Sequence, residues 1–365
     1  MRIGIDAREL GGRATGVGRY LGGLLHEWSA GPQARAHDFV LYAAEPIALP
    51  LDARLFATRI VPGSGGTWWE QVQAPRAATS DHLDVWFAPA YTAPLRLDVP
   101  IVVAIHDLSF VAHPEWFRVR EGARRRWLTR QSADTASAVI TISAFSKHEL
   151  TDRLDVPAHR IHVIPPGIAR LQPSALGALA TSPRRPAPSP RVLFVGSIFN
   201  RRHVTDLIRA FAPIARVHAG ASLDIVGDNR SYPREDLRRT IAREGLEAQV
   251  RWHEYVGDEE LQALYQQARA FAFLSEYEGL GLTPLEALAA GIPPVLADTP
   301  VARESCGDAA LYVPVGHVAA ATRALEAALF DEPTRARIRA AAPAQLVKYQ
   351  WPRAARETLA VIAHA

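Results

Sequence analysis

The 365-residue sequence contains one cysteine, Cys306, and no long uncharged hydrophobic run. A single cysteine excludes an intrachain disulfide and fits a reducing cytoplasm. No stretch approaches the roughly 18 apolar residues that a membrane-spanning helix needs. The opening run of residues 1–6 is too short for the apolar core of a signal peptide. We therefore expect a soluble cytoplasmic protein that is at most peripheral to the inner face of the cell membrane.

The sequence also lacks a marked excess of either sign of charge. Lys plus Arg is 41 and Asp plus Glu is 38, which leaves a net charge of +3. So small an excess does not by itself favour nucleic acid or a membrane as the partner, and we expect no nucleic-acid partner. The length favours two domains, because a single hydrophobic core rarely serves so many residues.

Short apolar runs alternate with helical patterns along the chain, and we interpret these runs as strands. In the first half they cover residues 2–5, 39–42, 85–87, 101–105, 138–142 and 162–164. In the second half they cover residues 192–195, 223–226, 270–274, 294–296 and 311–313. Strands that are short, apolar on both faces and separated by helices predict parallel α/β sheets covered by helices.

A proline-rich segment separates the two halves. Four prolines lie within residues 182–190, which excludes a helix or strand there. We predict a linker at 171–190 between an N-terminal domain of residues 1–170 and a C-terminal domain of residues 191–350. A closing helix is expected at 351–365. In doubly wound domains that face each other, ligands bind in the cleft outside the carboxyl ends of the strands, so we expect the chemistry in the loops that follow strands.

The densest signal follows the predicted strand at 270–274. Gly279 and Gly281 allow the backbone to turn its N–H groups inward, and Thr283 followed by Pro284 is typical of a helix N-cap and first helical position. A glycine loop that leads into a helix N-terminus predicts an anion site, because unpaired N–H groups and the helix dipole both favour negative charge.

Two glutamates flank this helix start. Glu278 beside an anion site is favourable if it binds hydroxyl groups of a ligand, and sugar hydroxyls are the natural candidates; the alternative is a solvated loop acid. Glu286 also has two interpretations, which have equal weight. It either contacts a ligand or only completes a capping box with Thr283. The local sequence leaves both interpretations open.

Three further loops follow predicted strands. Arg201 and Arg202 lie between strand 192–195 and a helix, where two guanidinium groups can grip a diphosphate, unless they are simply solvated. The loop after the first strand is long and glycine-rich, which suits covering a ligand or a mobile surface better than a tight dinucleotide turn. His106 and Asp107 end strand 101–105, where they either contact a sugar and an acceptor hydroxyl or only complete a polar strand end.

Taken together, these segments resemble the family 4 retaining glycosyltransferases, in particular bacterial mannosyltransferase-like members. The resemblance follows the chain in order and rests on the spacing of Glu278 and Glu286 and on residues 5–8, 15–20, 69–71, 105–110, 113–116, 141–146, 165–168 and 196–202. It implies a GT-B fold, with two Rossmann-like doubly wound parallel-sheet domains that face a cleft and a C-terminal helix that crosses back to the first domain.

The resemblance also implies residue roles. Glu286 would bond the donor ribose, Glu278 the transferred sugar, and Arg202 the diphosphate in place of the usual lysine. His106 would contact the sugar near the reacting carbon, and Gly16 would approach the phosphates. The catalytic candidates are His106, Asp107, Arg202 and Glu278, and the donor-binding candidates are Gly16, Gly18, Ser197, Arg201, Arg202, Gly279, Leu280, Gly281, Leu282 and Glu286. Ser197 directly after Gly196 makes the cationic clamp thinner than the family's.

The expected reaction expels a nucleoside diphosphate, whose growing charge is stabilised by cations and N–H groups. We expect neither a metal nor a cofactor, because the sequence has no obvious Asp-x-Asp at a strand end and no Cys/His cluster. No carboxylate nucleophile is evident either. Departure and attack on the same face of the sugar are favoured, with the leaving phosphate taking the acceptor proton and Asp107 as the weaker candidate base.

A basic segment at 116–130 combines six arginines with Trp116, Phe117 and Trp127. We favour a solvated helix whose tryptophans point to the core. The second interpretation is docking on anionic lipid, where the protein would meet a lipid-linked acceptor.

The sequence thus favours transfer of a hexose, with mannose from GDP-mannose as the first choice, to a glycan or lipid-linked acceptor. A UDP-sugar donor is the alternative. A sugar-nucleotide epimerase and a non-catalytic sugar-binding protein rank lower. A phosphorylase is disfavoured, because Lys147 and Lys348 are the only lysines and neither lies in a loop suited to pyridoxal phosphate.

Overall fold

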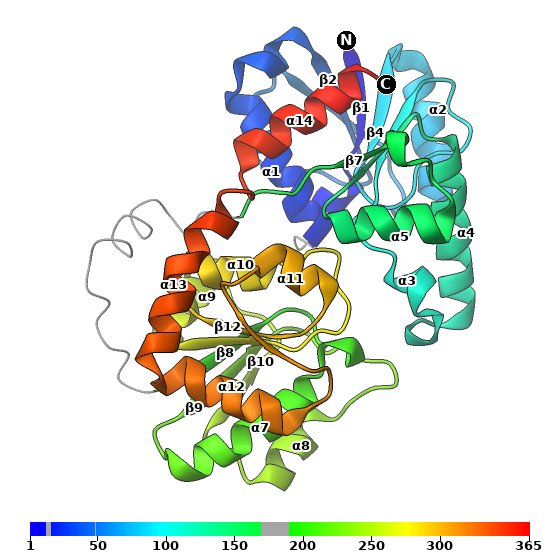
Figure 1. Ribbon diagram of the computed structural model, residues 1–365. Coiled ribbons are helices and arrows are strands. Elements are labelled where there is room, and N and C mark those ends of the chain that lie inside the picture. Colours follow the sequence, from blue (N-terminus) through cyan, green and yellow to red (C-terminus); the bar gives the residue numbers. More distant parts are fainter. Residues whose placement is uncertain (12–15, 48, 169–189) are drawn as a thin grey trace. The chain divides into compact units, whose positions relative to one another are not determined.

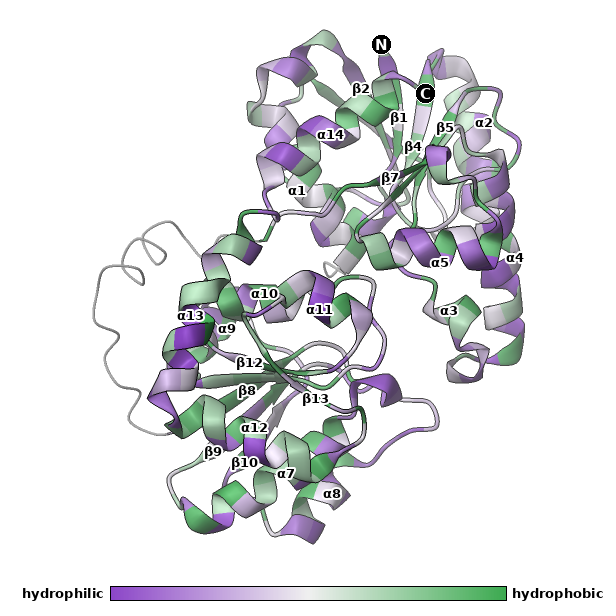
Figure 2. Cartoon of the chain, viewed as in Figure 1, coloured by the Kyte–Doolittle hydropathy of each residue, from purple (hydrophilic) through white to green (hydrophobic). Residues whose placement is uncertain are grey.

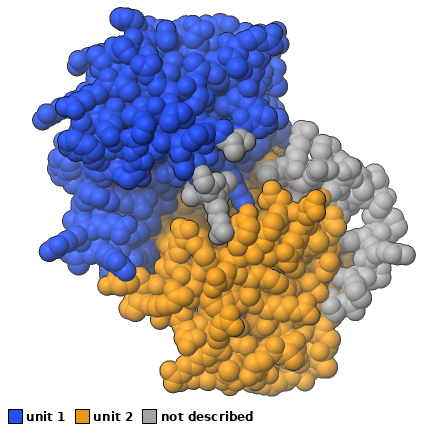
Figure 3. Space-filling model, turned by 180° about the vertical axis from the view of Figure 1, so that it is seen from behind, with its two compact units in different colours: residues 1–167, 349–365 blue, residues 168–348 orange. Residues whose placement is uncertain are grey.

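Two compact units make up the part of the chain that the structure describes. The computed structural model describes residues 1–11, 16–47, 49–168 and 190–365. Unit 1 contains Met1–Gly167 and Tyr349–Ala365, and unit 2 contains Ile168–Lys348 (Figure 3). The linker predicted at 171–190 lies outside the described residues, apart from its last residue.

Unit 1 is built on a parallel sheet whose strand order, within the described ranges, is β3-β2-β1-β4-β5-β6-β7. The order reverses between β1 and β4, and the carboxyl ends at such a reversal are where α/β folds bind ligands. The strands are β1 (Arg2–Asp6), β2 (Asp38–Ala43), β3 (Phe56–Ile60), β4 (Val85–Ala88), β5 (Ile101–Ala104), β6 (Ala138–Thr141) and β7 (Ile161–Val163).

Alternate residues of these strands build two hydrophobic cores, one on each face of the sheet. Phe39 and Leu41 of β2 belong to the core under α1 and α14, whereas Val40 and Tyr42 belong to the opposite core. This follows from the twofold side-chain period of a strand. The helices of unit 1 are α1 (Gly16–Ala30), α2 (Ala74–Ala78), α3 (Ser109–Ala112), α4 (Val119–Thr135), α5 (Ala144–Leu154) and α14 (Trp351–Ala363). Its single-turn segments are η1 (Arg8–Leu10), η2 (Pro32–Ala36), η3 (Trp69–Gln73), η4 (Thr79–Asp81), η5 (Pro114–Trp116) and η6 (Ala158–Arg160).

Unit 2 repeats this plan on a parallel sheet with the order β10-β9-β8-β11-β12-β13 among the described residues. Here the order reverses between β8 and β11. The strands are β8 (Arg191–Val195), β9 (Ser222–Val226), β10 (Val250–His253), β11 (Ala270–Phe273), β12 (Pro294–Ala297) and β13 (Leu311–Val313). The helical segments are η7 (Asn200–Arg202), α7 (Val204–Val217), α8 (Leu237–Glu244), α9 (Asp258–Gln267), α10 (Leu282–Ala289), α11 (Pro300–Cys306), α12 (Val318–Phe330) and α13 (Glu332–Leu346). The predicted α/β architecture with two parallel sheets is confirmed.

Two strands were not predicted, and both lie at a sheet edge. β3 exposes every residue after Phe56, and β10 buries only Val250 fully. Because an edge strand has a neighbour on one side only, it carries polar residues such as Arg59 and Arg251 and lacks the continuous apolar run that marks a central strand.

The C-terminal helix α14 returns to unit 1 and lies beside α1 (Figure 1). The predicted face of this helix is confirmed, because Ala355, Leu359 and Ile362 are buried in the core that α1 also covers. The Trp28 indole donates a hydrogen bond to the Ala355 carbonyl at 2.9 Å. The two ends of the sequence therefore belong to one hydrophobic core. Among the described residues, no helix is both long enough and apolar enough to cross a membrane.

Candidate active site

The glycine loop after β11 leads into α10, but the helix begins earlier than the sequence indicates. Gly281 is the N-cap, with a left-handed φ of 84°, and α10 runs from Leu282 to Ala289. Thr283 is therefore not the N-cap, and Pro284 is not the first helical residue. Glycine adopts this left-handed conformation without strain, which lets the chain enter the helix sooner than a threonine cap would.

This start leaves the first turn of α10 without a capping side chain, since glycine has none. The capping box predicted as one interpretation of Glu286 is wrong. Its carboxylate accepts a hydrogen bond from the Tyr265 hydroxyl of α9 at 3.1 Å instead. An N-terminus capped by glycine suits an anionic ligand, whose oxygens would accept from the first N–H groups and lie at the positive end of the helix dipole.

Arg202 and Glu278 form an ion pair at the point where the strand order of unit 2 reverses. The Arg202 Nε donates to Glu278 Oε1 at 2.7 Å and Nη2 donates to Oε2 at 3.1 Å. The Ser275 hydroxyl also donates to Oε1, at 2.9 Å. Arg202 follows β8 and Glu278 follows β11, so the pair joins the two strands on either side of the reversal. The sequence assigned these residues to different parts of a ligand; the structure brings them into contact.

Close backbone approach fixes the direction of the Arg202 side chain. Its Nη1 donates to the Ser197 carbonyl at 2.8 Å. A Cβ on Gly196 would lie 2.6 Å from Nη1, and a Cβ on Gly227 would lie 2.0 Å from the Gly196 carbonyl oxygen. A side chain at position 227 would displace backbone and one at position 196 would displace the Arg202 guanidinium, and the positive φ values of Gly196 and Gly227, 148° and 151°, also favour glycine. The β8–η7 loop and the loop after β9 pack together, and the guanidinium lies against their backbone.

The charges around Glu278 keep it ionised. Burial raises the pKa of this carboxyl, but the positive charges of Arg202 and Arg201 and its hydrogen bonds lower the pKa by more. The pKa therefore lies below its ordinary value. The Arg201 guanidinium lies 4.4 Å from the centre of the Phe199 ring, and the Arg201 carbonyl accepts from the Glu276 backbone N–H at 2.9 Å. The site thus combines one carboxylate with two guanidinium groups close to a helix N-terminus.

His106 and Asp107 follow β5 in unit 1, and both are held by hydrogen bonds. The His106 Nε2 lies 2.8 Å from the Pro89 carbonyl oxygen, and burial lowers the pKa of its imidazole. Asp107 accepts from the backbone N–H and hydroxyl of Ser109 at 2.9 and 2.7 Å and from the Tyr91 hydroxyl at 3.0 Å. A neutral imidazole and an oriented carboxylate therefore end this strand.

The two glycines among the donor-binding candidates of unit 1 lie at the start of α1. Gly16 is its first residue and is exposed, whereas Gly18 is buried. The preceding loop, from residue 12 to residue 15, lies outside the described residues.

Several side chains that hydrogen-bond the candidate carboxylates were not predicted; they include those of Ser275, Tyr265, Tyr91 and Ser109. Ser275 and Ser109 lie within three residues of the carboxylate that each contacts, so their proximity was a usable signal. Tyr265 and Tyr91 reach their partners from other elements, and no local pattern marks them. Within the described ranges, no group of three or more His, Cys, Asp or Glu residues is arranged to hold a metal ion.

The basic segment at 116–130 was expected to form a solvated helix whose tryptophans point to the core, and the helix α4 differs in its tryptophan. It is largely hydrophilic (Figure 2), yet Val119 and Trp127 are 83% and 58% exposed. Trp127 therefore does not point to the core. Trp116 is half-buried and stacks on His113 with ring centres 3.8 Å apart.

Both halves of the chain are similar to known proteins. The family model "Glycosyltransferase Family 4" matches residues 14–170, and "Glycosyl transferases group 1" matches residues 180–345. The chain is 27% identical to O-antigen chain mannosyltransferase B of Escherichia coli, over 77% of this chain and 75% of that protein. It is 30% identical to glycogen synthase of Mycobacterium tuberculosis, over 77% of this chain and 67% of that protein. Its structure is similar to that of Anabaena HepE in complex with UDP and glucose, with a TM-score of 0.75, 18% identity and coverage of 100% and 99% of the two chains.

Proposed function

This chain belongs to the family 4 glycosyltransferases, and we propose that it transfers a hexose from a nucleoside diphosphate sugar with retention of configuration and without a metal. The observation that carries the proposal is the Arg202–Glu278 pair beside the glycine-capped start of α10. The site offers cations and N–H groups where a diphosphate would gain charge, and a carboxylate for the hydroxyl groups of its sugar.

Departure of the diphosphate is the difficult step, and fixed positive groups act on it most effectively because they need no reorganisation. Arg202 suits this role: its guanidinium has more N–H groups than its bonds to Glu278 and Ser197 use. Arg201 and the backbone N–H groups of Gly279–Leu282 would add to the clamp. The departing phosphate would then take the proton of the acceptor hydroxyl on the same face of the sugar.

The two glutamates have separate proposed roles. Glu278 is ionised and would accept from hydroxyl groups of the transferred sugar. Glu286 would accept from the ribose hydroxyls of the donor, with Tyr265 holding its carboxylate in place. In unit 1 we assign His106 to the sugar, Asp107 to the acceptor hydroxyl, and Gly16 and Gly18 to the covering of the donor phosphates.

The first-choice donor is GDP-mannose and the first-choice acceptor is a glycan or a lipid-linked glycan. Relatives named as mannosyltransferases support this choice, including the GDP-mannose:cellobiosyl-diphosphopolyprenol α-mannosyltransferase of Xanthomonas oryzae. A UDP-sugar donor is the second candidate, supported by the fold shared with HepE, whose structure holds UDP and glucose. An epimerase or a non-catalytic sugar-binding protein ranks below both.

A thermal-shift screen against GDP, UDP, ADP and their sugars identifies the donor, because a ligand that binds only the folded protein raises its apparent stability. Sugar transfer from that donor then tests the site. We expect Glu278→Ala to reduce transfer at least tenfold and Glu276→Ala, two residues earlier in the same loop, to leave it near wild type. Normal transfer by Glu278→Ala would rule out the donor site.

A lipid-linked acceptor would require contact with a membrane, and we propose α4 as the contact on unit 1. Its exposed residues include Val119, Trp127 and the arginines Arg120, Arg124 and Arg130, and the exposed Arg118 directly precedes the helix. Exposed apolar groups among arginines are typical of helices that dock on anionic lipid.

Sedimentation with vesicles that contain or lack phosphatidylglycerol tests this contact. We expect pelleting only with the anionic lipid, several-fold less for Trp127→Ser, and no change for Trp68→Ser, an exposed tryptophan outside α4. If the amount of protein that pellets is the same with and without phosphatidylglycerol, the proposed membrane contact is wrong.

A further inference from the structure

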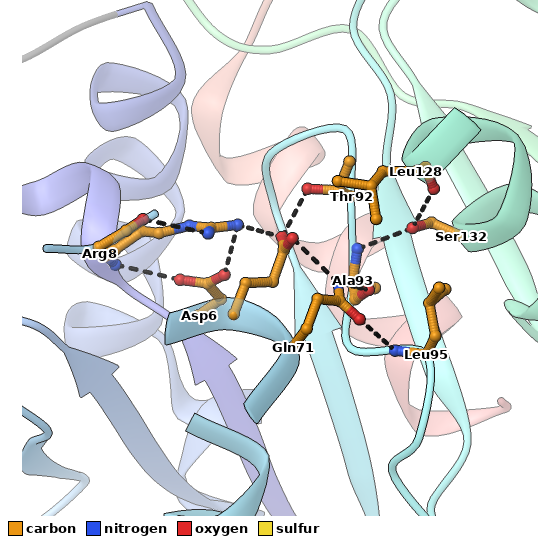
Figure 4. Close-up of polar contacts among 10 residues, drawn as sticks. Asp6, Arg8, Gln71, Thr92, Ala93, Leu95, Leu128 and Ser132 are labelled. Carbon is orange, nitrogen blue, oxygen red and sulfur yellow. Dashed lines mark hydrogen bonds and ion pairs between the residues drawn. The ribbon is translucent and has the colours of Figure 1, made fainter. Parts of the chain in front are cut away.

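A buried polar cluster lies at the carboxyl end of β1 in unit 1 (Figure 4). The Arg8 guanidinium contacts the carboxylates of Asp6, at 3.0 Å, and Glu70, and it donates to the Gly65 carbonyl at 3.3 Å. Asp6 and Glu70 are each only 2% exposed. Two carboxylates thus share one guanidinium almost out of contact with water, an arrangement that is unfavourable unless every partner is held in place.

The cluster continues from Glu70 into the segment between β4 and β5, residues 89–95. Glu70 accepts from the Thr92 hydroxyl at 2.5 Å and from the Gln71 amide at 3.0 Å. Gln71 in turn donates to the Ala93 carbonyl at 2.9 Å and accepts from the Leu95 N–H at 3.1 Å. These bonds fasten the 89–95 segment to the π-helical turn η3, which carries both Glu70 and Gln71.

The same segment holds both candidate residues at the end of β5. The Pro89 carbonyl oxygen lies 2.8 Å from the His106 Nε2, and the Tyr91 hydroxyl donates to Asp107 at 3.0 Å. Within one short segment, therefore, Thr92 is tied to the buried cluster, while Pro89 and Tyr91 are tied to the side chains assigned to the substrate.

Tyr91 adopts a strained conformation at the centre of the segment. Its φ is 63°, a left-handed value that is unfavourable for a residue with a Cβ, by roughly 1–2 kcal/mol. Such a residue persists only where its surroundings determine its conformation, and strain of this kind concentrates at functional sites. Here the Thr92–Glu70 bond holds one side, while Asp107 accepts from the Tyr91 hydroxyl and the Arg125 guanidinium lies 4.6 Å from the centre of its ring.

We propose that Glu70, clamped by Arg8, is a positioning residue: through Thr92 it fixes the 89–95 segment, and through Pro89 and Tyr91 it sets the orientation of His106 and Asp107. The inference rests on the roles proposed above for these two residues. Glu70 itself need not contact the substrate. Its part is to transmit a fixed geometry from the core of unit 1 to the end of β5, where a small displacement of a reacting group lowers the rate steeply.

Thr92→Val tests the link, because valine keeps the shape of threonine and replaces only its hydroxyl group with a methyl group. GDP release from GDP-mannose, or from the donor that the screen selects, is measured with a panel of acceptors that includes water. We expect kcat to fall about tenfold or more with the donor KM within twofold of wild type, because most of the proposed donor contacts lie in unit 2. Thr92→Ser restores the hydroxyl and should recover most of the activity.

Tyr42→Phe is the matched control. It removes another buried hydroxyl of unit 1, which donates to Asp81 and not to a residue of the 89–95 segment. We expect this variant to lower the melting temperature at least as much as Thr92→Val and to keep the wild-type kcat. Equal kcat losses in both variants, or failure of Thr92→Ser to recover activity, would show that the bond is merely structural.

Variants at the end of β5 separate this inference from the proposed function. If His106→Ala and Asp107→Ala keep the wild-type kcat, the roles assigned to these residues are wrong, and the inference is wrong with them. If these variants lose activity while Thr92→Val does not, the proposed function stands and the positioning role of Glu70 is wrong.

Discussion

Each unit has an Arg–Glu pair at the reversal of its strand order, and the two pairs differ in what surrounds them. In unit 1, Arg8 follows β1 and reaches Glu70, which is tied to the segment after β4. In unit 2, Arg202 follows β8 and pairs with Glu278 after β11. The reversal is where such sheets open a crevice for a ligand, so both pairs occupy equivalent places in their own unit.

The difference lies in burial and in the number of carboxylates. Glu70 and Asp6 are 2% exposed and share Arg8, whose side chain is 12% exposed and also donates to the Gly65 carbonyl. The side chains of Arg202 and Glu278 are 14% and 16% exposed, and a glycine-capped helix begins nearby in the sequence. A buried pair fixes backbone, whereas an accessible pair keeps charge available to a ligand. The first should therefore respond to substitution in stability as well as in activity, the second mainly in activity.

Arg8→Ala is expected to have the largest effect on stability. It leaves the buried carboxylates of Asp6 and Glu70 unpaired, so the free energy of unfolding should fall by about 3–5 kcal/mol. All of the chain's eight tryptophans except Trp252 lie in unit 1, so urea unfolding followed by tryptophan fluorescence reports mainly on this unit.

The control for this variant is Arg353→Ala, which breaks an exposed pair with Glu357 in α14 of the same unit. Exposed pairs of this kind contribute under about 1 kcal/mol. If Arg8→Ala costs no more than Arg353→Ala, the cluster does not hold unit 1 together.

Arg202→Ala should lower activity far more than it lowers stability. Removing one preorganised group that stabilises a leaving anion costs about 100- to 1,000-fold in kcat, equivalent to roughly 3–4 kcal/mol of barrier, while tryptophan-monitored unfolding of unit 1 should not change. Arg202→Lys keeps the charge but loses the forked contact with Glu278, so its rate should lie between those of wild type and Arg202→Ala. A loss of stability in unit 1 with little loss of rate would contradict the comparison.

The pH dependence of stability gives a third test. Burial raises the pKa of Asp6 from 3.8 to about 6, although the charge of Arg8 opposes this. Between these values the folded chain holds a proton that the unfolded chain has released, so this contribution falls as pH rises from about 4 to about 6. The unfolding free energy of wild type minus that of Asp6→Asn should therefore fall by up to about 3 kcal/mol from pH 4 to pH 7.

Asp52→Asn gives the opposite sign for comparison. Hydrogen bonds from Arg54 at the surface lower the pKa of Asp52, so its contribution is present at neutral pH and is lost as pH falls through the lowered value. The difference between wild type and this variant should therefore rise slightly with pH. A difference for Asp6→Asn that also rises with pH would mean that the ion pair with Arg8, rather than burial, dominates.

The central strands could be predicted from the sequence because burial on both faces requires unbroken apolar runs, as in β5 and β11. The edge strands β3 and β10 could not, since exposure permits polar residues and removes that signal. The start of α10 was placed wrongly at Thr283. A serine or threonine before a proline is the usual cap signal, but here the preceding Gly281 supplies a left-handed conformation that ends the loop earlier.

The site was predictable to a lesser degree than the fold. The residue types of Arg202 and Glu278 could be identified from loops that follow strands, but not their contact across 76 residues of sequence. Arg8 and Glu70, 62 residues apart, belong to segments that carried the family resemblance without an assigned role. Sequence position shows which loops lie at the carboxyl edge of a sheet; which side chains pair there depends on packing that no local pattern encodes.

The smallest expected effect concerns Glu286, which lies on α10 beyond the ion pair of unit 2. Tyr265→Phe removes the hydroxyl that bonds this carboxylate and keeps the ring in the core against Phe271. A single hydrogen bond to a charged group contributes about 1.5–3 kcal/mol at most, and rotation of Glu286 toward solvent would recover part of it. We therefore expect a donor KM a few-fold higher with kcat almost unchanged, because the ribose lies far from the bond that breaks. A fall in kcat instead of a rise in KM would place Glu286 with the ion pair at the reacting centre, and the division of roles between the two glutamates would be wrong.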